Sequence, residues 1–350
     1  MSGRIDHPSH PVLRPRRVGI CGGGSIDAAS AHFCERFGWA LAGVDGVVIA
    51  TGGSKHYIGR PSEPATEWSV VKGALARLQR DGGSVERRIE TLLPMEGSGD
   101  TVRFRVGRTL DLHNRSWQAR RFRLVHSTDV LVAVQGGSGT QLQIDLALAL
   151  ERRCLPLPFT GGAARTRWDE NRSTICQQFG LDEAAATALE AVDLRTADED
   201  RLDDIAQSTV QLLVSSLKRK CFVMMPFAKD FDELYAVVIE PAISSEGFEA
   251  VRTDRINLVG NAVTVLKDAI EASDCALAVI TGHNPNVMYE LGFAHAEGKP
   301  VILLTEGDPE LSGLDLPFDL KNEYVIQYRR DYRGLRPAVE GVLRELRESR

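Results

Sequence analysis

The chain has few long apolar runs, and this scarcity excludes one class of protein. Nowhere in its 350 residues does an apolar stretch approach the roughly 18 residues that are needed to span a bilayer. Residues 1–17 are polar, contain Pro11 and Pro15, and lack the apolar core of a signal peptide. We therefore expect a cytoplasmic protein that has no membrane partner.

Cysteine is also scarce, and acidic residues outnumber basic ones. The six cysteines show no CxxC spacing, so the sequence indicates neither a disulfide framework nor a metal site. The formal net charge of −6 argues against general binding to nucleic acid. Residues 115–123 are locally basic, with Arg120, Arg121 and Arg123. A basic patch in an acidic protein suits a small anionic ligand better than a duplex.

The remaining composition is that of a soluble globular protein, with 43% hydrophobic and 26% charged residues. Apolar strands alternate with helices across short glycine turns, which predicts the α/β class with doubly wound parallel sheets. We expect two such domains, Rossmann-like or flavodoxin-like, joined by a helical bridge. The predicted parts are a flexible N-terminus (1–16), a first domain (17–162), the bridge (163–218), and a second domain that ends in a C-terminal helix (219–350).

Glycine clusters follow three predicted strands of the first domain, at residues 18–21, 46–50 and 130–134. Each cluster precedes a predicted helix (28–41, 66–79 and 142–151). Glycine lets a backbone approach a ligand closely, and free amides at a helix N-terminus bind phosphate. Three such loops at equivalent sheet edges predict a nucleotide site, and tight structural turns are the alternative. The loop residues are Gly22, Gly23, Gly24 and Ser25; Gly52 and Gly53; and Gly136, Gly137, Ser138, Gly139 and Thr140.

The third loop reads Gln-Gly-Gly-Ser-Gly-Thr-Gln-Leu-Gln over residues 135–143. It resembles the Pro-Gly-Gly-x-Gly-Thr-x-x-Glu motif of the SLOG superfamily, which contains the LOG phosphoribohydrolases and DNA-processing proteins. Arg120 lies as far before this motif as the catalytic arginine of those enzymes. The final glutamate is Gln143 here, so the resemblance implies nucleotide binding by Arg120, Gln143 and the loops rather than nucleotide cleavage. Gln143 can still hydrogen-bond a ribose or a base.

The second domain contains a carboxylate where parallel sheets bind ligands. Residues 276–280 form a short apolar strand, residues 284–286 a turn, and residues 287–296 the start of a helix. Open α/β sheets bind ligands at the carboxyl ends of their strands. Glu290, in the first turn of the predicted helix, can act there as a nucleophile or charge stabiliser. The alternative is that its charge favours the helix N-terminus.

Two further motifs resemble the nucleoside 2-deoxyribosyltransferase-like and TIR-like group. They are Phe-Val-Met-Met-Pro-Phe at residues 222–227 and Asn-Pro-Asn-Val-Met-Tyr-Glu-Leu-Gly at residues 284–292. The resemblance covers residues 219–327 and implies that Glu290 is catalytic. Relatives commonly carry an acid where this chain has Val279, and we name Asp254 as a candidate replacement. The implied substrate-binding residues are Pro226, Phe227, Asp254, Asn284, Asn286 and Tyr289.

Together the two resemblances imply a nucleotide sensor coupled to an effector, as in bacterial antiphage or stress-response proteins. The first domain would bind a small nucleotide signal, and the second would cleave an N-glycosidic bond, with NAD as the favoured substrate and no required cofactor. We expect a homo-oligomer. Two alternatives remain open: a stand-alone nucleoside or nucleotide N-glycosidase or 2-deoxyribosyltransferase, and a non-enzymatic nucleotide-binding module.

Overall fold

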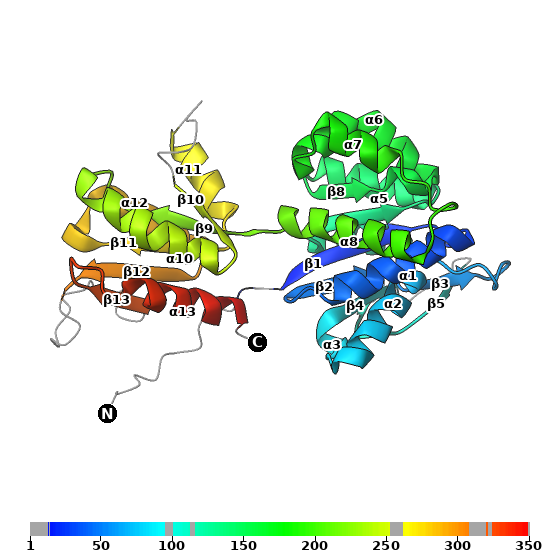
Figure 1. The fold of residues 1–350 in the computed structure, drawn as a ribbon, viewed down its shortest axis with the longest axis horizontal. Helices are drawn as coiled ribbons and strands as arrows, with labels where there is room; N and C mark the ends of the chain where they lie inside the picture. The colour runs from blue at the N-terminus through cyan, green and yellow to red at the C-terminus, as the bar shows by residue number, and fades with distance from the viewer. Residues whose placement is uncertain are drawn as a thin grey trace. The chain divides into compact units, whose positions relative to one another are not determined.

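The computed structural model describes residues 13, 15–94, 101–112, 116–252, 262–307, 320 and 324–348. The chain forms two compact units (Figure 1). The N-terminal unit runs from Pro15 to Leu217, and the C-terminal unit contains Leu13 and the residues from Lys218 onward. Each unit is built on a parallel sheet with helices on both faces, which confirms the predicted fold class.

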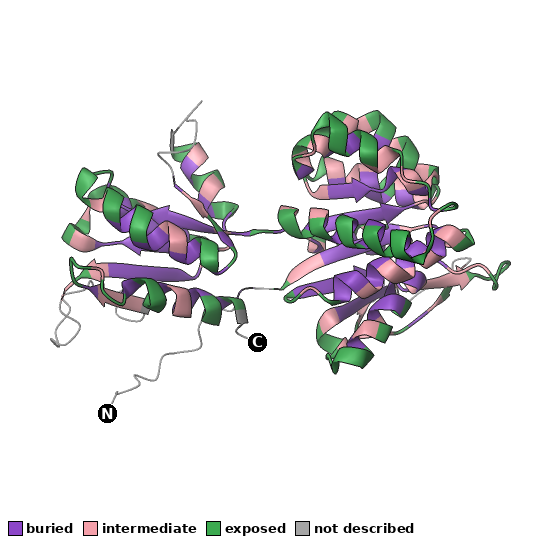
Figure 2. Ribbon diagram, in the orientation of Figure 1, coloured by how far each residue is buried: buried purple, intermediate pink, exposed green. Residues whose placement is uncertain are grey.

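The N-terminal sheet has six parallel strands in the order β6-β4-β2-β1-β7-β8. Strands β2 and β7 are buried along their whole length because helices cover both faces, and Figure 2 shows these strands in purple. This explains why their sequences are continuous apolar runs. The strands are β1 (Arg16–Gly22), β2 (Val47–Thr51), β4 (Ile89–Pro94), β6 (Arg108–Leu112), β7 (Val130–Val134) and β8 (Arg153–Pro156).

Helices and a two-stranded sheet complete this unit. In this sheet β3 (Ser54–Tyr57) pairs in antiparallel fashion with β5 (Thr101–Arg103), outside the main sheet and with helices and β4 between them in the chain. Several helices begin at a side-chain cap, as at Asp27, whose carboxylate accepts from Ser30 N at 2.9 Å. The helices are α1 (Ala28–Ala42), α2 (Thr66–Asp81), α3 (Val85–Arg88), α4 (Trp117–Ser127), α5 (Ser138–Ala149), the 3₁₀ turn η1 (Pro158–Thr160), α6 (Gly162–Phe179), α7 (Glu183–Glu190) and α8 (Glu199–Ser216).

The predicted bridge requires a correction. Its helices α6, α7 and α8 contribute to the same apolar core as β1 and α1, and Trp168 of α6 is fully buried there. The indole nitrogen of Trp168 donates to Glu190 Oε1 at 2.7 Å, which ties α6 to α7. Residues 163–217 therefore complete the N-terminal unit instead of forming a separate element. Leu13, predicted to be flexible, is only 7% exposed and packs in the core of the C-terminal unit.

The C-terminal sheet has five parallel strands in the order β10-β9-β11-β12-β13. Its two faces are covered by different helices, with α10 and α13 on one side and α11 and α12 on the other. The strands are β9 (Arg219–Met224), β10 (Phe248–Val251), β11 (Cys275–Val279), β12 (Val301–Glu306) and β13 (Tyr324–Tyr328). The helical segments are η2 (Lys229–Phe231), α9 (Asp232–Leu234), the π-helical turn η3 (Tyr235–Ile239), α10 (Glu240–Ser245), α11 (Ala262–Glu271), η5 (Thr281–His283), α12 (Pro285–Ala296) and α13 (Leu335–Glu348).

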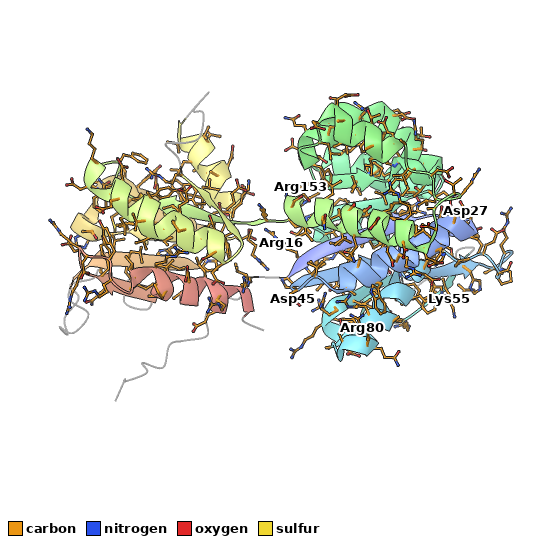
Figure 3. The ribbon with its side chains drawn as sticks, viewed as in Figure 1. Arg16, Asp27, Asp45, Lys55, Arg80 and Arg153 are labelled. Carbon is orange, nitrogen blue, oxygen red and sulfur yellow. The ribbon has the colours of Figure 1, made fainter. Side chains whose placement is uncertain are left out.

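Both sheets have a point where the strand order reverses. In the N-terminal unit the chain winds outward from β1 to β2, β4 and β6, and then returns to place β7 on the other side of β1. In the C-terminal unit β9 lies between β10 and β11. The carboxyl ends of such strands border the crevice in which α/β proteins bind ligands. Figure 3 shows this edge of the N-terminal sheet at Asp27 and Lys55, opposite the edge marked by Arg16.

Candidate functional site

The first glycine loop is pressed between β7 and α2. A Cβ on Gly22 would lie 2.4 Å from the carbonyl oxygen of Val134 and from Thr66 Oγ1, so only glycine fits there. The backbone of Gly23 donates to Val134 O (3.2 Å) and accepts from Thr66 N (2.9 Å). The Ser25 hydroxyl donates to Glu63. This loop therefore lies directly beside the end of β7, at the reversal point of the sheet.

In the third loop, carbonyl groups are hydrogen-bonded to α6, and several backbone amides are available to bind a ligand. Gln135 and Gly136 have φ angles of 52° and 85°. Their carbonyl oxygens accept from the first turn of α6, and Gln135 N donates to Thr160 Oγ1 at 2.8 Å. Gly137 is the N-cap of α5 and offers no side-chain acceptor. Within the described part of the chain, the N–H groups of Gly136, Gly137 and Ser138 donate no hydrogen bond, as an anion site requires.

Arg120 lies beneath the second loop. Its side chain is nearly buried, with the whole residue 4% exposed, and its Nη1 lies 1.3 Å from the position that a Cβ on Gly52 would take. The nearest carboxylate, Glu67 Oε1, is 3.9 Å from Nη1, and the other Glu67 oxygen accepts from Ser54 N at 2.6 Å. Neither Nε nor Nη1 of Arg120 has a hydrogen-bond partner among the described residues. Burial lowers the pKa of this guanidinium, because a charged group is less stable away from water. The protein therefore holds a positive charge in a position that costs folding free energy.

A second arginine, which the sequence did not indicate, lies beside it. Arg103 Nη1 donates to Gly52 O and to Ser54 Oγ, both at 2.8 Å, while its buried Nε has no partner among the described residues. The guanidinium carbons of Arg103 and Arg120 lie 4.2 and 5.3 Å from the ring centre of Trp117. Burial, together with the charge of Arg120, lowers the pKa of Arg103 to about 10.

The guanidinium groups of Arg103 and Arg120 share Glu67 as a nearby carboxylate. Glu67 raises the pKa values of both buried groups. Arg121 adds a third cation, with Nη2 2.6 Å from the Cβ position of Gly139 in the first turn of α5. Phosphate or carboxylate oxygens would supply the acceptors that these guanidinium groups lack. The structure therefore brings the predicted Arg120 together with the predicted loops and adds Arg103 and Glu67.

Thr140 and Gln143 lie inside α5, and both are almost fully buried. Gln143 Nε2 has no hydrogen-bond partner among the described residues. An amide at the position where the resembling enzymes carry glutamate can donate to a ligand, but it cannot take up a proton as a carboxylate does. The local chemistry favours binding over hydrolysis.

Gly52→Ala tests whether the loop and Arg120 form one site. The added Cβ would overlap Arg120 Nη1, and because that side chain is buried it cannot simply turn into solvent. We expect a loss of about 1 to 3 kcal/mol of unfolding free energy and at least about tenfold weaker binding of an anion such as phosphate. Gly59→Ala is the matched control, since a Cβ there meets nothing within 4 Å. Urea denaturation and calorimetric titration of both variants measure the two effects, and wild-type behaviour of Gly52→Ala would contradict this arrangement.

Glu290 is placed by α12 in the C-terminal unit. The helix begins at Pro285, so Glu290 falls in its second turn, not in the first turn as predicted. The N-cap is Asn284, whose Oδ1 accepts from Asn286 N (3.0 Å) and Val287 N (3.4 Å). The helix start is thus satisfied without Glu290. Burial raises the pKa of Glu290 to about 7, and no cation pairs with it among the described residues.

The other predicted substrate-binding residues differ in exposure. Phe227 is 60% and Tyr289 54% exposed, and the Tyr289 ring packs edge-on against Phe293 with ring centres 4.9 Å apart. Asn286 is exposed and Pro226 is buried. The segments that carry Phe227 and Asn286 follow β9 and β11, which are neighbours, so they emerge at the same edge of the sheet. Asp254 lies outside the described residues.

The position of the absent acid is apolar. Val279 is fully buried at the end of β11 and belongs to the core on the α10 and α13 face. Two residues beyond the end of β11, Thr281 Oγ1 accepts from Glu306 N at 2.9 Å and lies 3.1 Å from the Tyr328 hydroxyl. The carboxylate of Glu306 is paired with Arg330 at 2.8 Å. Glu306 and Tyr328 were not predicted, because they end separate strands far from the two motifs.

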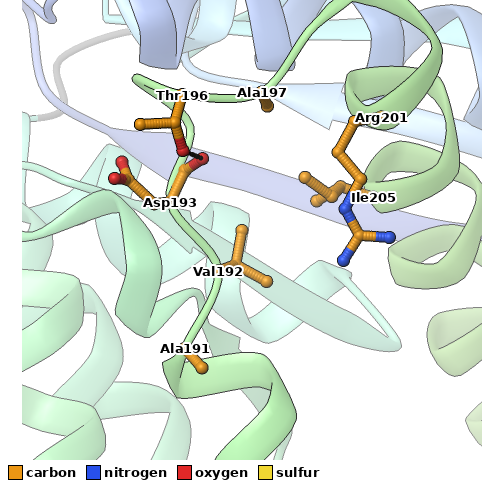
Figure 4. Close-up of a pocket in the computed structure, with 7 residues that line it drawn as sticks. All are labelled: Ala191, Val192, Asp193, Thr196, Ala197, Arg201 and Ile205. Atoms are coloured by element: carbon orange, nitrogen blue, oxygen red, sulfur yellow. Dashed lines mark hydrogen bonds between the residues drawn. The ribbon is translucent and has the colours of Figure 1, made fainter.

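Other features of the described structure give no indication of a ligand. Figure 4 shows a pocket at the α7–α8 connection, where Thr196 Oγ1 donates to Asp193 O at 3.4 Å. None of the predicted site residues lines it. Among the residues that the structure describes, no three His, Cys, Asp or Glu side chains are grouped to hold a metal ion. No helix in the same part of the chain combines the length and apolar content needed to cross a membrane.

Comparison with known proteins gives distant likenesses only. No protein-family model matches the chain, and no curated protein matches its sequence. The X-ray structure of TM1055 is similar at 22% identity, over 44% of this chain and 81% of that one, with a TM-score of 0.34. The molybdenum cofactor binding protein of the phototrophic bacterium Rippkaea orientalis is similar at 21% identity (41% and 76% covered, TM-score 0.30). The molybdenum cofactor carrier protein of Chlamydomonas reinhardtii is similar at 22% identity (40% and 75% covered, TM-score 0.29).

Proposed function

We propose that this protein is a nucleotide-responsive N-glycosidase. In this proposal the N-terminal unit binds a small nucleotide through its anionic group, and the C-terminal unit cleaves an N-glycosidic bond, with NAD as the favoured substrate. The observation that carries the first part is the buried guanidinium of Arg120, which has two nitrogens without hydrogen-bond partners among the described residues. Buried charges are normally paired, so a site with surplus donors implies an absent anionic partner.

The second part rests on Glu290. Cleavage of an N-glycosidic bond passes through an oxocarbenium-like state, and a carboxylate can stabilise that charge or trap it covalently. Asn284 caps the N-terminus of α12, so Glu290 is not needed as the cap. Burial raises the pKa of Glu290 to about 7. Strongly shifted carboxyl groups at the carboxyl edge of an α/β sheet are common at catalytic sites. Near neutral pH a substantial fraction is ionised and ready to act.

In this proposal, nucleotide binding to the N-terminal unit regulates the activity of the C-terminal unit. A nucleotide in the N-terminal unit can raise the activity of the C-terminal unit only if it binds more tightly to the active form of the whole protein. Homo-oligomer formation is our proposed route to that form. The biological role that fits this chemistry is an antiphage or stress response in which binding of the nucleotide signal activates the cleavage of NAD.

One observation favours a second candidate. Gln143 and Val279 stand where the resembling enzymes carry acids, and Val279 is buried among apolar side chains. A non-enzymatic nucleotide-binding module would need neither acid. This candidate keeps the N-terminal site and assigns no chemistry to Glu290.

Nicotinamide release from NAD distinguishes the two candidates. The full-length protein is incubated with NAD, alone and with cyclic nucleotides, nucleoside monophosphates or ADP-ribose, and free nicotinamide is followed by chromatography. We expect release that rises at least about tenfold with one of the added nucleotides. Release that is equally fast without any addition would support a stand-alone glycosidase. No release under any condition, combined with nucleotide binding by calorimetry, would support the binding module.

A further inference from the structure

The two-stranded β3–β5 sheet contacts two of the glycine loops. Its strands pair Ser54 with Arg103 and Tyr57 with Thr101. Figure 1 shows β3 and β5 at the end of the N-terminal unit where the carboxyl ends of the central strands lie. At one end of this small sheet, Arg103 donates to the carbonyl oxygen of Gly52 in the second loop. The other end carries Tyr57, three residues along β3 from Ser54.

Tyr57 lies on the first loop. A Cβ on Gly24 would be 2.7 Å from Cε2 and 3.0 Å from Cδ2 of the Tyr57 ring, so the ring edge rests on the bare backbone of Gly24. Tyr57 is nevertheless 41% exposed, which leaves much of its surface uncovered. Aromatic rings of this kind provide stacking surfaces for nucleobases, because every base has a π-face. Along the strand, three residues span about 10 Å, a distance that a mononucleotide covers between its phosphate and its base.

We propose that the two-stranded β3–β5 sheet recognises the nucleotide, with Tyr57 stacking on the base while Arg103 donates to the phosphate. This inference rests on the proposed nucleotide binding and adds the selection of base-containing ligands. Where the phosphate would bind, Arg103 and Arg120 have buried guanidinium nitrogens without hydrogen-bond partners among the described residues. The base end is prepared by an aromatic ring held against Gly24, where a larger residue would displace it. The small sheet thus carries both contacts, with Tyr57 on β3 and Arg103 on β5.

Two probes with the same sugar phosphate separate the contacts. AMP and ribose 5-phosphate differ only in the base, and calorimetric titration of the full-length protein measures both dissociation constants. We expect AMP to bind at least about tenfold more tightly than ribose 5-phosphate. Tyr57→Ala should remove most of that ratio, and Tyr57→Phe should retain it because the ring remains. Ile58→Ala, which truncates a 59% exposed neighbour, is the matched control and should leave the ratio unchanged.

Arg103→Gln provides the complementary result. It should weaken both probes by a similar factor of about 10 or more, since it acts on the shared phosphate. A wild-type ratio in Tyr57→Ala overturns the stacking contact and leaves nucleotide binding intact. If wild-type protein binds AMP no better than ribose 5-phosphate, the β3–β5 sheet does not recognise the base. If neither probe binds, the proposed nucleotide site fails together with this inference.

Discussion

Glu290→Gln is expected to lower nicotinamide release about 100-fold or more while the protein remains folded. Glutamine keeps the shape of the side chain but cannot carry the negative charge that stabilises an oxocarbenium-like state. The helix should not be disturbed, because its N-terminus is capped by Asn284 and Glu290 forms no ion pair within the described residues. The assay is the same measurement of free nicotinamide, with the activating nucleotide present at saturation.

The pH dependence gives an independent check on Glu290. Burial raises its pKa to about 7, so activity that needs the carboxylate should rise through about pH 7 and then level off. The folded protein holds a proton that the unfolded chain releases near pH 4.5. Its free energy of unfolding should therefore fall as pH rises from about 4.5 to about 7, and stay constant above that. Glu290→Gln removes this loss and should stabilise the protein at pH 8 by about 1 to 3 kcal/mol, a range that allows for partial solvent screening.

A control on the same helix separates the site from general charge effects. Glu297→Gln removes an exposed carboxylate at the C-cap of α12. It should change neither nicotinamide release nor the dependence of urea denaturation on pH. Retained release in Glu290→Gln would contradict the catalytic role. An unchanged stability profile in that variant would show that Glu290 is not held at a raised pKa.

Much of the fold could be predicted from hydrophobic pattern and turn residues. The predicted strand 130–134 is β7, and the helix predicted at 28–41 is α1 to within one residue. The helix predicted from residue 142 begins at Ser138, because the loop before it is held by Thr160, which accepts from Gln135 N, and by the start of α6, which donates to the loop carbonyls. Those partners lie more than 20 residues away in the sequence, and no local pattern reports them. Strands β4 and β6 were missed for a similar reason, since their places come from pairing with β2 and with each other.

The candidate site also contains residues that local sequence patterns predict and residues that they do not. The glycine loops and Arg120 could be predicted because motif spacing places them, and the structure adds the reason that glycine is needed at position 52. Arg103, Glu67 and Tyr57 could not, because they belong to different elements that meet only in the folded chain. The closeness of like charges is likewise invisible in sequence. Arg103 and Arg120 are 17 positions apart, and the folded chain brings both of them against Trp117 and Gly52.

Arg120→Met is expected to weaken AMP binding about 100-fold or more while leaving the unliganded protein as stable as wild type, or more stable. Methionine fills much of the same space without the charge. The loss of affinity follows because the buried donors of Arg120 form charge-assisted hydrogen bonds only when an anion is present. Calorimetric titration and urea denaturation measure the two quantities. Arg123→Met, at an exposed position of the same helix, is the matched control and should change neither.

The combination of lost binding and retained stability is the diagnostic result, because a structural arginine would behave differently. If Arg120 served only to pair with Glu67, its removal would leave a buried carboxylate without a compensating charge. Such a loss typically destabilises a protein by about 3 to 5 kcal/mol. Here Arg103 remains, and its charge also acts on Glu67. Removing one of two neighbouring cations relieves their repulsion and leaves one cation for one carboxylate. A large loss of stability in Arg120→Met, with AMP affinity unchanged, would therefore reassign Arg120 to the core of the fold and leave the glycine loops without an anion site.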